Sequence, residues 1–153
     1  MTTSTDGNIL FWDFKKQVEP LRPFDECVLT EPAYVSEDKG NVAETICGGT
    51  NIAFDINAGP TKFLVGTELG SICTVNARPK KPVEIMSRFG LDGGRHLGPV
   101  YSCQRNPDSS MFHYFLTVGD WTAQIWHDEL KTPIMRTKFH SSYLSDGCWS
   151  PSR

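Results

Sequence analysis

The stretch Tyr114–Trp126, YFLTVGDWTAQIW, carries the strongest structural signal in the sequence. β-Branched and aromatic residues lie on both sides of Gly119–Trp121, which is typical of two short strands joined by a tight turn. The second arm, Thr122–Trp126, alternates two kinds of residue, as a strand with unlike faces requires. The stretch therefore predicts a β-hairpin.

The same hairpin recurs along the chain. Near the N-terminus, Asp6 lies in a turn six residues before Trp12, which is the offset that separates Asp120 from Trp126. A weaker copy, Phe63–Val75, has glutamate and valine in these roles. Recurrence at a period of tens of residues predicts a repeat architecture.

On these residues the chain resembles WD-repeat proteins, whose blades carry Gly-His near the start and Trp-Asp at the end of the third strand. More narrowly, it resembles the axonemal dynein intermediate chains. The segments that carry this resemblance are Lys62–Glu68, Gly98–Tyr101 with Arg105–Pro107, Phe115–Trp126, and Ile134–Met135 through Tyr143–Leu144 to Trp149–Pro151. The hairpin at Phe115–Trp126 is the most specific of these segments, because an ordinary WD repeat has a small residue where Trp121 lies.

The resemblance and the strand pattern together predict an all-β fold, a partial WD-repeat β-propeller with two complete four-stranded blades and two partial ones. The expected divisions are the end of a blade at 1–30, an insertion loop at 31–49, a blade at 50–89, a blade at 90–139 and the start of the next at 140–153. A propeller ring usually needs about four to eight blades. We therefore expect this chain to be a fragment whose open sheet faces are buried in a longer protein.

Bulk composition restricts the class of protein. With 153 residues, 39% hydrophobic and 22% charged, the chain fits a soluble globular class. Its net charge of -3 and the lack of a basic stripe argue against nucleic acid as a partner. No apolar stretch approaches the roughly 20 residues that span a bilayer, and no signal peptide is recognisable. Five scattered cysteines without a C-x-x-C pair favour free thiols in a reducing, cytosolic compartment.

The resemblance also implies a structural hydrogen-bonded tie in each blade. In WD repeats the carboxylate of the turn aspartate accepts a hydrogen bond from the imidazole of the blade-start histidine. That imidazole is oriented towards the indole of the strand tryptophan. Val118 lies where the family usually has a serine in this tie. The residues assigned to it are Asp6, Trp12, His96, Asp120 and Trp126.

A catalytic interpretation of the same residues is the alternative. His96 and Asp120 could pair with Ser102 or Cys103 as a nucleophile, as in a hydrolase. The structural interpretation is favoured, because aspartate at the same offset from tryptophan recurs at Asp6, where no histidine is available. We therefore predict no catalytic residues and no enzyme.

Metal and phosphate sites have little support. The histidines are spaced too irregularly for a local ligand pair, and no cysteine lies at a finger-like distance. The glycine-rich segment Gly90–Arg95 has no following Lys-Ser/Thr and no helix to supply a dipole. We predict no metal and no cofactor; the four histidines are His96, His113, His127 and His140.

Trp121 is the candidate for partner contact. A tryptophan in a tight turn cannot easily bury both faces in its own blade, and exposed aromatic residues often anchor interfaces. The alternative is packing over the neighbouring blade. Arg95 and His96 should lie nearby, since blade connections and these turns share one rim in WD propellers. Trp121 and Arg95 are therefore the predicted contact residues.

By resemblance, the expected function is that of a non-catalytic scaffold subunit of an axonemal dynein motor complex, which moves cilia and flagella. The implied partners are a dynein heavy chain, a second intermediate chain and, as a further implication, the microtubule. The implied location is the cytoplasm, cytoskeleton and axoneme. The alternatives are a WD-repeat adaptor of another complex and a β-propeller hydrolase.

Overall fold

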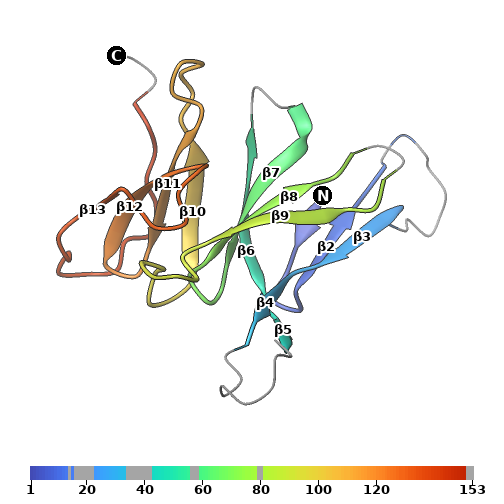
Figure 1. Ribbon diagram of the computed structural model, residues 1–153, viewed down its shortest axis with the longest axis horizontal. Helices are drawn as coiled ribbons and strands as arrows, with labels where there is room; N and C mark the ends of the chain where they lie inside the picture. The colour runs from blue at the N-terminus through green and yellow to red at the C-terminus, as the bar shows by residue number, and fades with distance from the viewer. Residues whose placement is uncertain (14, 16–22, 34–42, 56–58, 79–80, 151–153) are drawn as a thin grey trace.

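The computed structural model describes residues 1–13, 15, 23–33, 43–55, 59–78 and 81–150. Within these ranges all regular structure is β, arranged as four antiparallel sheets (Figure 1). None of the described residues forms a helix that is long and apolar enough to cross a membrane. The predicted all-β architecture is therefore the one observed.

The sheets follow the chain in order. The first holds β1 (Thr2–Thr3), β2 (Asn8–Phe11) and β3 (Asp25–Val28), and a separate two-stranded sheet pairs β4 (Thr30–Pro32) with β5 (Glu44–Ile46). A four-stranded sheet follows with β6 (Gly49–Asp55), β7 (Gly59–Thr67), β8 (Ile72–Asn76) and β9 (Glu84–Phe89). The last holds β10 (Val100–Arg105), β11 (Tyr114–Gly119), β12 (Thr122–His127) and β13 (Met135–Arg136). Consecutive antiparallel strands in chain order are the topology of a propeller blade.

The hairpin β11–β12 has the register that its sequence predicts. Phe115 lies opposite Trp126, and Gly119 lies opposite Thr122. The rings of Phe115 and Trp126 are nearly parallel, at 3° and with centroids 6.1 Å apart. Asp120 closes the turn with a φ of 45°, a left-handed conformation that aspartate tolerates because its short side chain bonds to nearby backbone.

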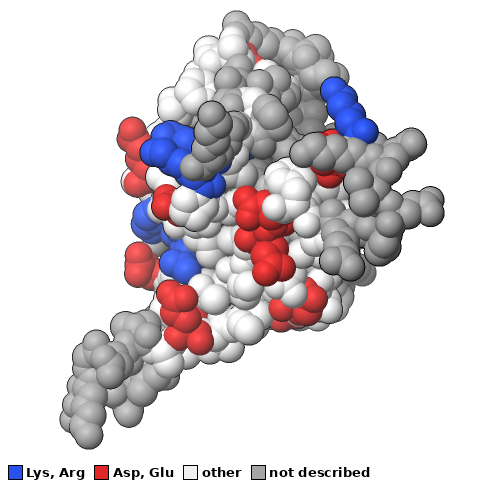
Figure 2. Space-filling model, turned by 90° about the vertical axis from the view of Figure 1, so that its right-hand side faces the viewer, with Lys and Arg blue, Asp and Glu red and all other residues white. Residues whose placement is uncertain are grey.

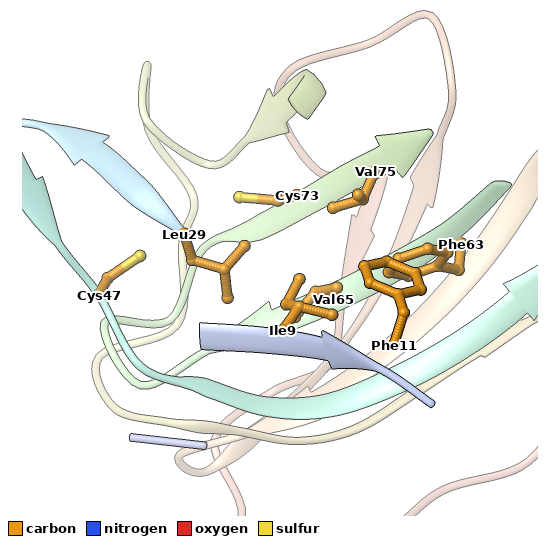
Figure 3. Close-up of a cluster of buried hydrophobic side chains, with 8 residues drawn as sticks. All are labelled: Ile9, Phe11, Leu29, Cys47, Phe63, Val65, Cys73 and Val75. Carbon is orange, nitrogen blue, oxygen red and sulfur yellow. The ribbon is translucent and has the colours of Figure 1, made fainter. Parts of the chain in front are cut away.

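The first apolar core lies between the first sheet and β6–β9. The aromatic rings of Phe11 and Phe63 meet there at 6.1 Å, and the thiols of Cys47 and Cys73 lie beside Leu29 (Figure 3). The full cluster is Ile9, Phe11, Leu29, Cys47, Phe63, Val65, Cys73 and Val75. Each of these side chains is at most 7% exposed, so the two sheets share a dry interface.

The second apolar core lies between β6–β9 and β10–β13. Leu64 belongs to it, whereas its neighbours Phe63 and Val65 point into the first core. Strand β7 is therefore buried on both faces, which explains its continuous apolar run. The members of this cluster are Ala53, Leu64, Ile72, Phe89, Val100, Cys103, Phe115 and Trp126. In Figure 1 the three larger sheets follow one another from right to left, as successive blades do.

Some segments differ from the expected divisions. In 31–49, predicted as an insertion loop, the described residues include most of β4 and all of β5, while 34–42 lie outside the described part. The blade expected at 90–139 ends in a short outer strand, β13. The described part of 140–153 has no strand; it lies along β10, where Trp149 Nε1 donates to the carbonyl oxygen of Gln104 at 3.0 Å.

Candidate functional site

A buried chain of hydrogen bonds links the connection before β10 to strands β11 and β12. Trp126 Nε1 donates to Thr117 Oγ1 at 2.8 Å, and Thr117 Oγ1 lies 2.9 Å from His96 Nε2. His96 Nδ1 lies 3.3 Å from Asp120 Oδ1. Because an indole N–H can only donate and a carboxylate can only accept, the bonds run from Trp126 through Thr117 and His96 to Asp120. We call these four residues the relay.

Asp120 ends the relay and also closes its own turn. Its carboxylate accepts from the backbone N–H of Leu97 at 2.8 Å and from the backbone N–H of Thr122 at 2.8 Å. The hydroxyl of Thr122 donates to the same carboxylate at 2.9 Å. Burial favours a higher pKa for Asp120, but hydrogen bonds from Leu97, Thr122 and His96 outweigh it and lower the pKa.

His96 is a neutral structural group at physiological pH. It is 1% exposed, and this burial lowers its pKa against the opposing effect of the Asp120 carboxylate. Both ring nitrogens take part in hydrogen bonds within the protein. Because the imidazole is also buried, a substrate cannot reach it to use it as a general base.

Among the described residues, neither predicted nucleophile is hydrogen-bonded to His96. The Ser102 hydroxyl donates to the carbonyl oxygen of Gly147 at 3.4 Å. Cys103 is buried, which raises its pKa to about 12, so it is a thiol at neutral pH. The hydroxyl beside the imidazole is that of Thr117. Thr117, His96 and Asp120 are 0%, 1% and 3% exposed, and the Thr117 hydroxyl also accepts from Trp126, so this hydroxyl–imidazole–carboxylate contact is closed to a substrate.

Thr117 is the relay residue that sequence reasoning missed. We expected position 118 to carry the hydroxyl of the tie, but Val118 points to the other face of β11, where its side chain meets Gly147. Side chains alternate along a strand, so a shift of one residue changes the face. The sequence did carry a signal for Thr117. It lies two residues from Phe115, a large apolar residue of the same strand, and side chains two residues apart share a face.

Asp6 and Trp12 have separate partners. The Asp6 carboxylate accepts from the backbone and side-chain nitrogens of Asn8 at 3.0 and 2.9 Å, and from the Ser4 hydroxyl. Trp12 Nε1 donates to Thr2 Oγ1 at 3.0 Å. The expected tie between these two residues therefore needs correction, because Asp6 is exposed and lies in a turn that it stabilises locally, without a histidine.

The β7–β8 turn has a related but different polar cluster. Glu68 takes the place of Asp120, and its carboxylate accepts from the backbone N–H of Gly48 at 2.9 Å. A buried glutamate, Glu31, accepts from the hydroxyls of Thr67 and Ser71. Burial raises the pKa of Glu31, although the hydrogen bond from Thr67 and nearby arginines oppose the shift. No local pattern in the sequence pointed to Glu31, because its partners Thr67 and Ser71 lie far along the chain.

The predicted contact residues lie on the same rim as the relay. Trp121 is half-buried and stacks on Tyr143, with ring centroids 4.4 Å apart and an angle of 25°. Arg95 is about half exposed, and its Nη1 lies 4.0 Å from Glu31 Oε2. Trp121 thus packs on one face against the chain itself, and Arg95 bridges neighbouring blades.

The histidines do not form a metal centre in the described part of the chain, where no group of three or more metal-binding side chains occurs. The rings of His113 and His127 lie 5.6 Å apart. His113 Nδ1 lies 3.5 Å from Asp128 Oδ2, and Arg105 pairs with the same carboxylate at 2.9 Å. This cluster is an ion-pair network at the other end of β11 and β12.

The stacked four-stranded sheets and the relay define the chain as WD-repeat β-propeller blades. A chain in the crystal structure of the mitotic checkpoint complex has the same fold, with a TM-score of 0.64 at 15% identity, covering 97% of this chain and 36% of that one. No family model matches the sequence.

Similarity to known sequences shows which WD-repeat proteins this chain is related to. Over its whole length the chain is a homologue of part of the axonemal dynein intermediate chains. It is 46% identical over 155 residues to the 70 kDa intermediate chain of the flagellar outer arm dynein of Chlamydomonas reinhardtii, covering 100% of this chain and 24% of that protein. Identity is 42% with the ciliary dynein intermediate chain 3 of Heliocidaris crassispina and 40% with human dynein axonemal intermediate chain 2, each covering 99% of this chain.

These relatives confirm the predicted resemblance. Their names describe them as flagellar, ciliary or axonemal, which agrees with the predicted axonemal location. The chain spans only about a quarter of their length, at 24% and 23%.

Proposed function

We propose that this chain forms part of a non-catalytic β-propeller scaffold in an axonemal dynein intermediate chain and serves the movement of cilia or flagella. The observation that carries the proposal is the 40–46% identity to such chains over 99–100% of the sequence. The chain would then be a subunit of a dynein complex, as those relatives are by name.

The packing supports a scaffold role. Both apolar cores lie between sheets, so neighbouring blades hold each other in place. The relay uses its polar groups internally and fixes the connection before β10 against the turn after β11. Loops on such a support keep fixed positions, and binding energy then comes from a few anchors rather than from reordering of the chain.

The proposed partners are a dynein heavy chain and a second intermediate chain. The face in Figure 2 intersperses acidic side chains with Lys and Arg, and the described residues on it form no broad basic surface. Such a face suits protein partners better than a polyanion. Microtubule contact, which the resemblance implies, has no comparable support on this face.

Affinity purification from flagellated cells tests the proposal. The chain is expressed with a tag, axonemes are extracted with salt, and proteins that co-purify are identified by mass spectrometry. We expect a dynein heavy chain and a second intermediate chain in near-equal amounts. Phe89→Asp, which charges the core between the blades, is the matched control and should lose both.

One outcome favours the alternative. If the folded, tagged chain enters axonemes but brings down another complex and no dynein heavy chain, the chain is a WD-repeat adaptor of that other complex.

A further inference from the structure

Two apolar side chains hold equivalent positions in successive blades. Leu69 directly follows Glu68, and Trp121 directly follows Asp120, in the turns between second and third strands. Each acid accepts a backbone N–H from the connection that precedes its blade, from Gly48 at 2.9 Å and from Leu97 at 2.8 Å respectively. The repeat geometry therefore brings the β7–β8 and β11–β12 turns, which carry Leu69 and Trp121, to the same end of the sheets.

Leu97 and Tyr143 extend this surface. The backbone N–H of His96, next to Leu97, donates to the carbonyl oxygen of Gly70 at 3.1 Å, so Leu97 lies beside the Leu69 turn. Tyr143 stacks on Trp121. We call Leu69, Leu97, Trp121 and Tyr143 the apolar rim. It crosses from one complete blade to the next.

The apolar rim is exposed to solvent. Leu97 is 77% exposed, Tyr143 61% and Leu69 42%, and none of them belongs to either apolar core. Exposed apolar side chains that gather at one end of neighbouring blades, unlike single exposed residues, are typical of interaction sites. A leucine, an aromatic pair and a second leucine could act as anchors for a partner.

Charge indicates what kind of partner fits. Arg95 lies two residues from Leu97 and is about half exposed, and its pairing with Glu31 at 4.0 Å leaves other guanidinium donors available. Arg136 is also exposed and bonds to the Gly94 carbonyl oxygen at 2.8 Å. The acids nearby, Glu68 and Asp120, already accept backbone N–H groups.

We propose that the apolar rim, with Arg95 and Arg136, binds an acidic amphipathic segment of a partner protein. Apolar side chains of that segment pack on Leu97 and its neighbours, and its Asp or Glu residues pair with the two guanidinium groups, which recognise carboxylates in bidentate geometry. The proposal goes beyond the scaffold role, because the surface would serve a propeller of any complex.

Peptide display tests the proposal. The purified chain is the bait for a random library of 16-residue peptides, and selected peptides are synthesised for fluorescence-anisotropy titration. We expect the selected sequences to combine Leu, Ile, Phe or Trp with Asp or Glu. Leu97→Ser should weaken their binding by about tenfold or more, as loss of an anchor does.

Two further variants make the result specific. Met86→Ser, on the outer strand β9 and 57% exposed, is the matched control and should leave affinity unchanged. Arg95→Glu should reduce binding of acidic peptides and shift selection towards Lys and Arg. Circular dichroism and thermal melting show that each variant is folded.

Several results would overturn the proposal. They are selection of no peptides, enrichment of basic or uncharged peptides by the unmodified chain, and acidic peptides that bind the folded Leu97→Ser variant as tightly as the Met86→Ser control. None of these outcomes bears on co-purification with a dynein heavy chain, so the scaffold proposal stands or falls separately.

Discussion

The indole nitrogen of Trp126 donates to the hydroxyl of Thr117 across 2.8 Å, although the two residues are not opposite each other in the hairpin. The residue opposite Trp126 is Phe115, and Thr117 is diagonal to the tryptophan. This diagonal bond places the hydroxyl where it can also donate to His96. One threonine thus joins the strand that carries the tryptophan to the connection that carries the histidine.

Removing this hydroxyl should destabilise the chain. Thr117→Val keeps the shape but leaves the buried Trp126 and His96 nitrogens unpaired, so we expect the free energy of unfolding to fall by about 2–4 kcal/mol. Thr117→Ser retains the hydroxyl and should lose about 1 kcal/mol. Urea unfolding followed by tryptophan fluorescence measures both. Equal stability of the two variants would contradict the relay.

His96 should make stability depend on pH. Burial lowers its folded pKa, so the unfolded state binds more protons, and its stabilising contribution is lost as the pH falls below about 6.5. We expect the difference in urea midpoint between the unmodified chain and His96→Gln to be larger at pH 7.5 than at pH 5. A difference that does not change with pH would show that His96 does not titrate in this way.

Glu31 should make stability depend on pH in the opposite direction. Its folded pKa is raised, so its contribution is fully present at acidic pH and is lost as the pH rises through the folded value. Glu31→Gln keeps an acceptor for Ser71 and Thr67 without the buried charge. We therefore expect this variant to gain stability relative to the unmodified chain as the pH rises from 4 to 8.

The exposed Glu129→Gln substitution is the control for Glu31. The change in stability between pH 4 and pH 8 should be the same for this control as for the unmodified chain. If Glu31→Gln also shows that same change, the carboxylate of Glu31 does not carry the expected pH dependence.

The glycine in the β7–β8 turn should be sensitive to substitution. Gly70 has a φ of +87°, and a Cβ there would overlap the carbonyl oxygen of His96. We expect Gly70→Ala to cost about 2–4 kcal/mol, since both the backbone and the blade contact would be strained. Gly98→Ala is the matched control, because no atom lies within 4 Å of a Cβ at that position. Similar melting temperatures for both variants would contradict this contact.

The thiols should differ in reactivity. Burial raises the pKa of Cys47, Cys73 and Cys103 to about 12 each, whereas Cys148 is exposed. With a disulfide reagent at pH 8, Cys148 should react first, and the three buried thiols only after unfolding. Mass spectrometry of the labelled peptides locates the modified residues. Rapid labelling of Cys73 in the folded chain would contradict the first apolar core.

The sequence by itself determined the hairpin at Gly119–Trp121, its recurrence and hence the blade architecture. These signals are local: turn residues fix the backbone and alternation fixes the faces of a strand. The resemblance to axonemal dynein intermediate chains depended on such local runs, and whole-length identity bears it out.

Only the tertiary structure decided which polar groups meet. Thr117 and Val118 are neighbours in sequence, and the face that each occupies depends on how β11 packs against β6–β9 and against 140–150. Glu31 reaches Ser71 from 40 residues away. Asp6 and Asp120 share an offset from tryptophan, yet Asp6 is exposed whereas Asp120 is only 3% exposed, because the connection that carries Leu97 folds over Asp120. Contacts between distant segments arise from the stacking of blades, and that is why no local pattern encodes them.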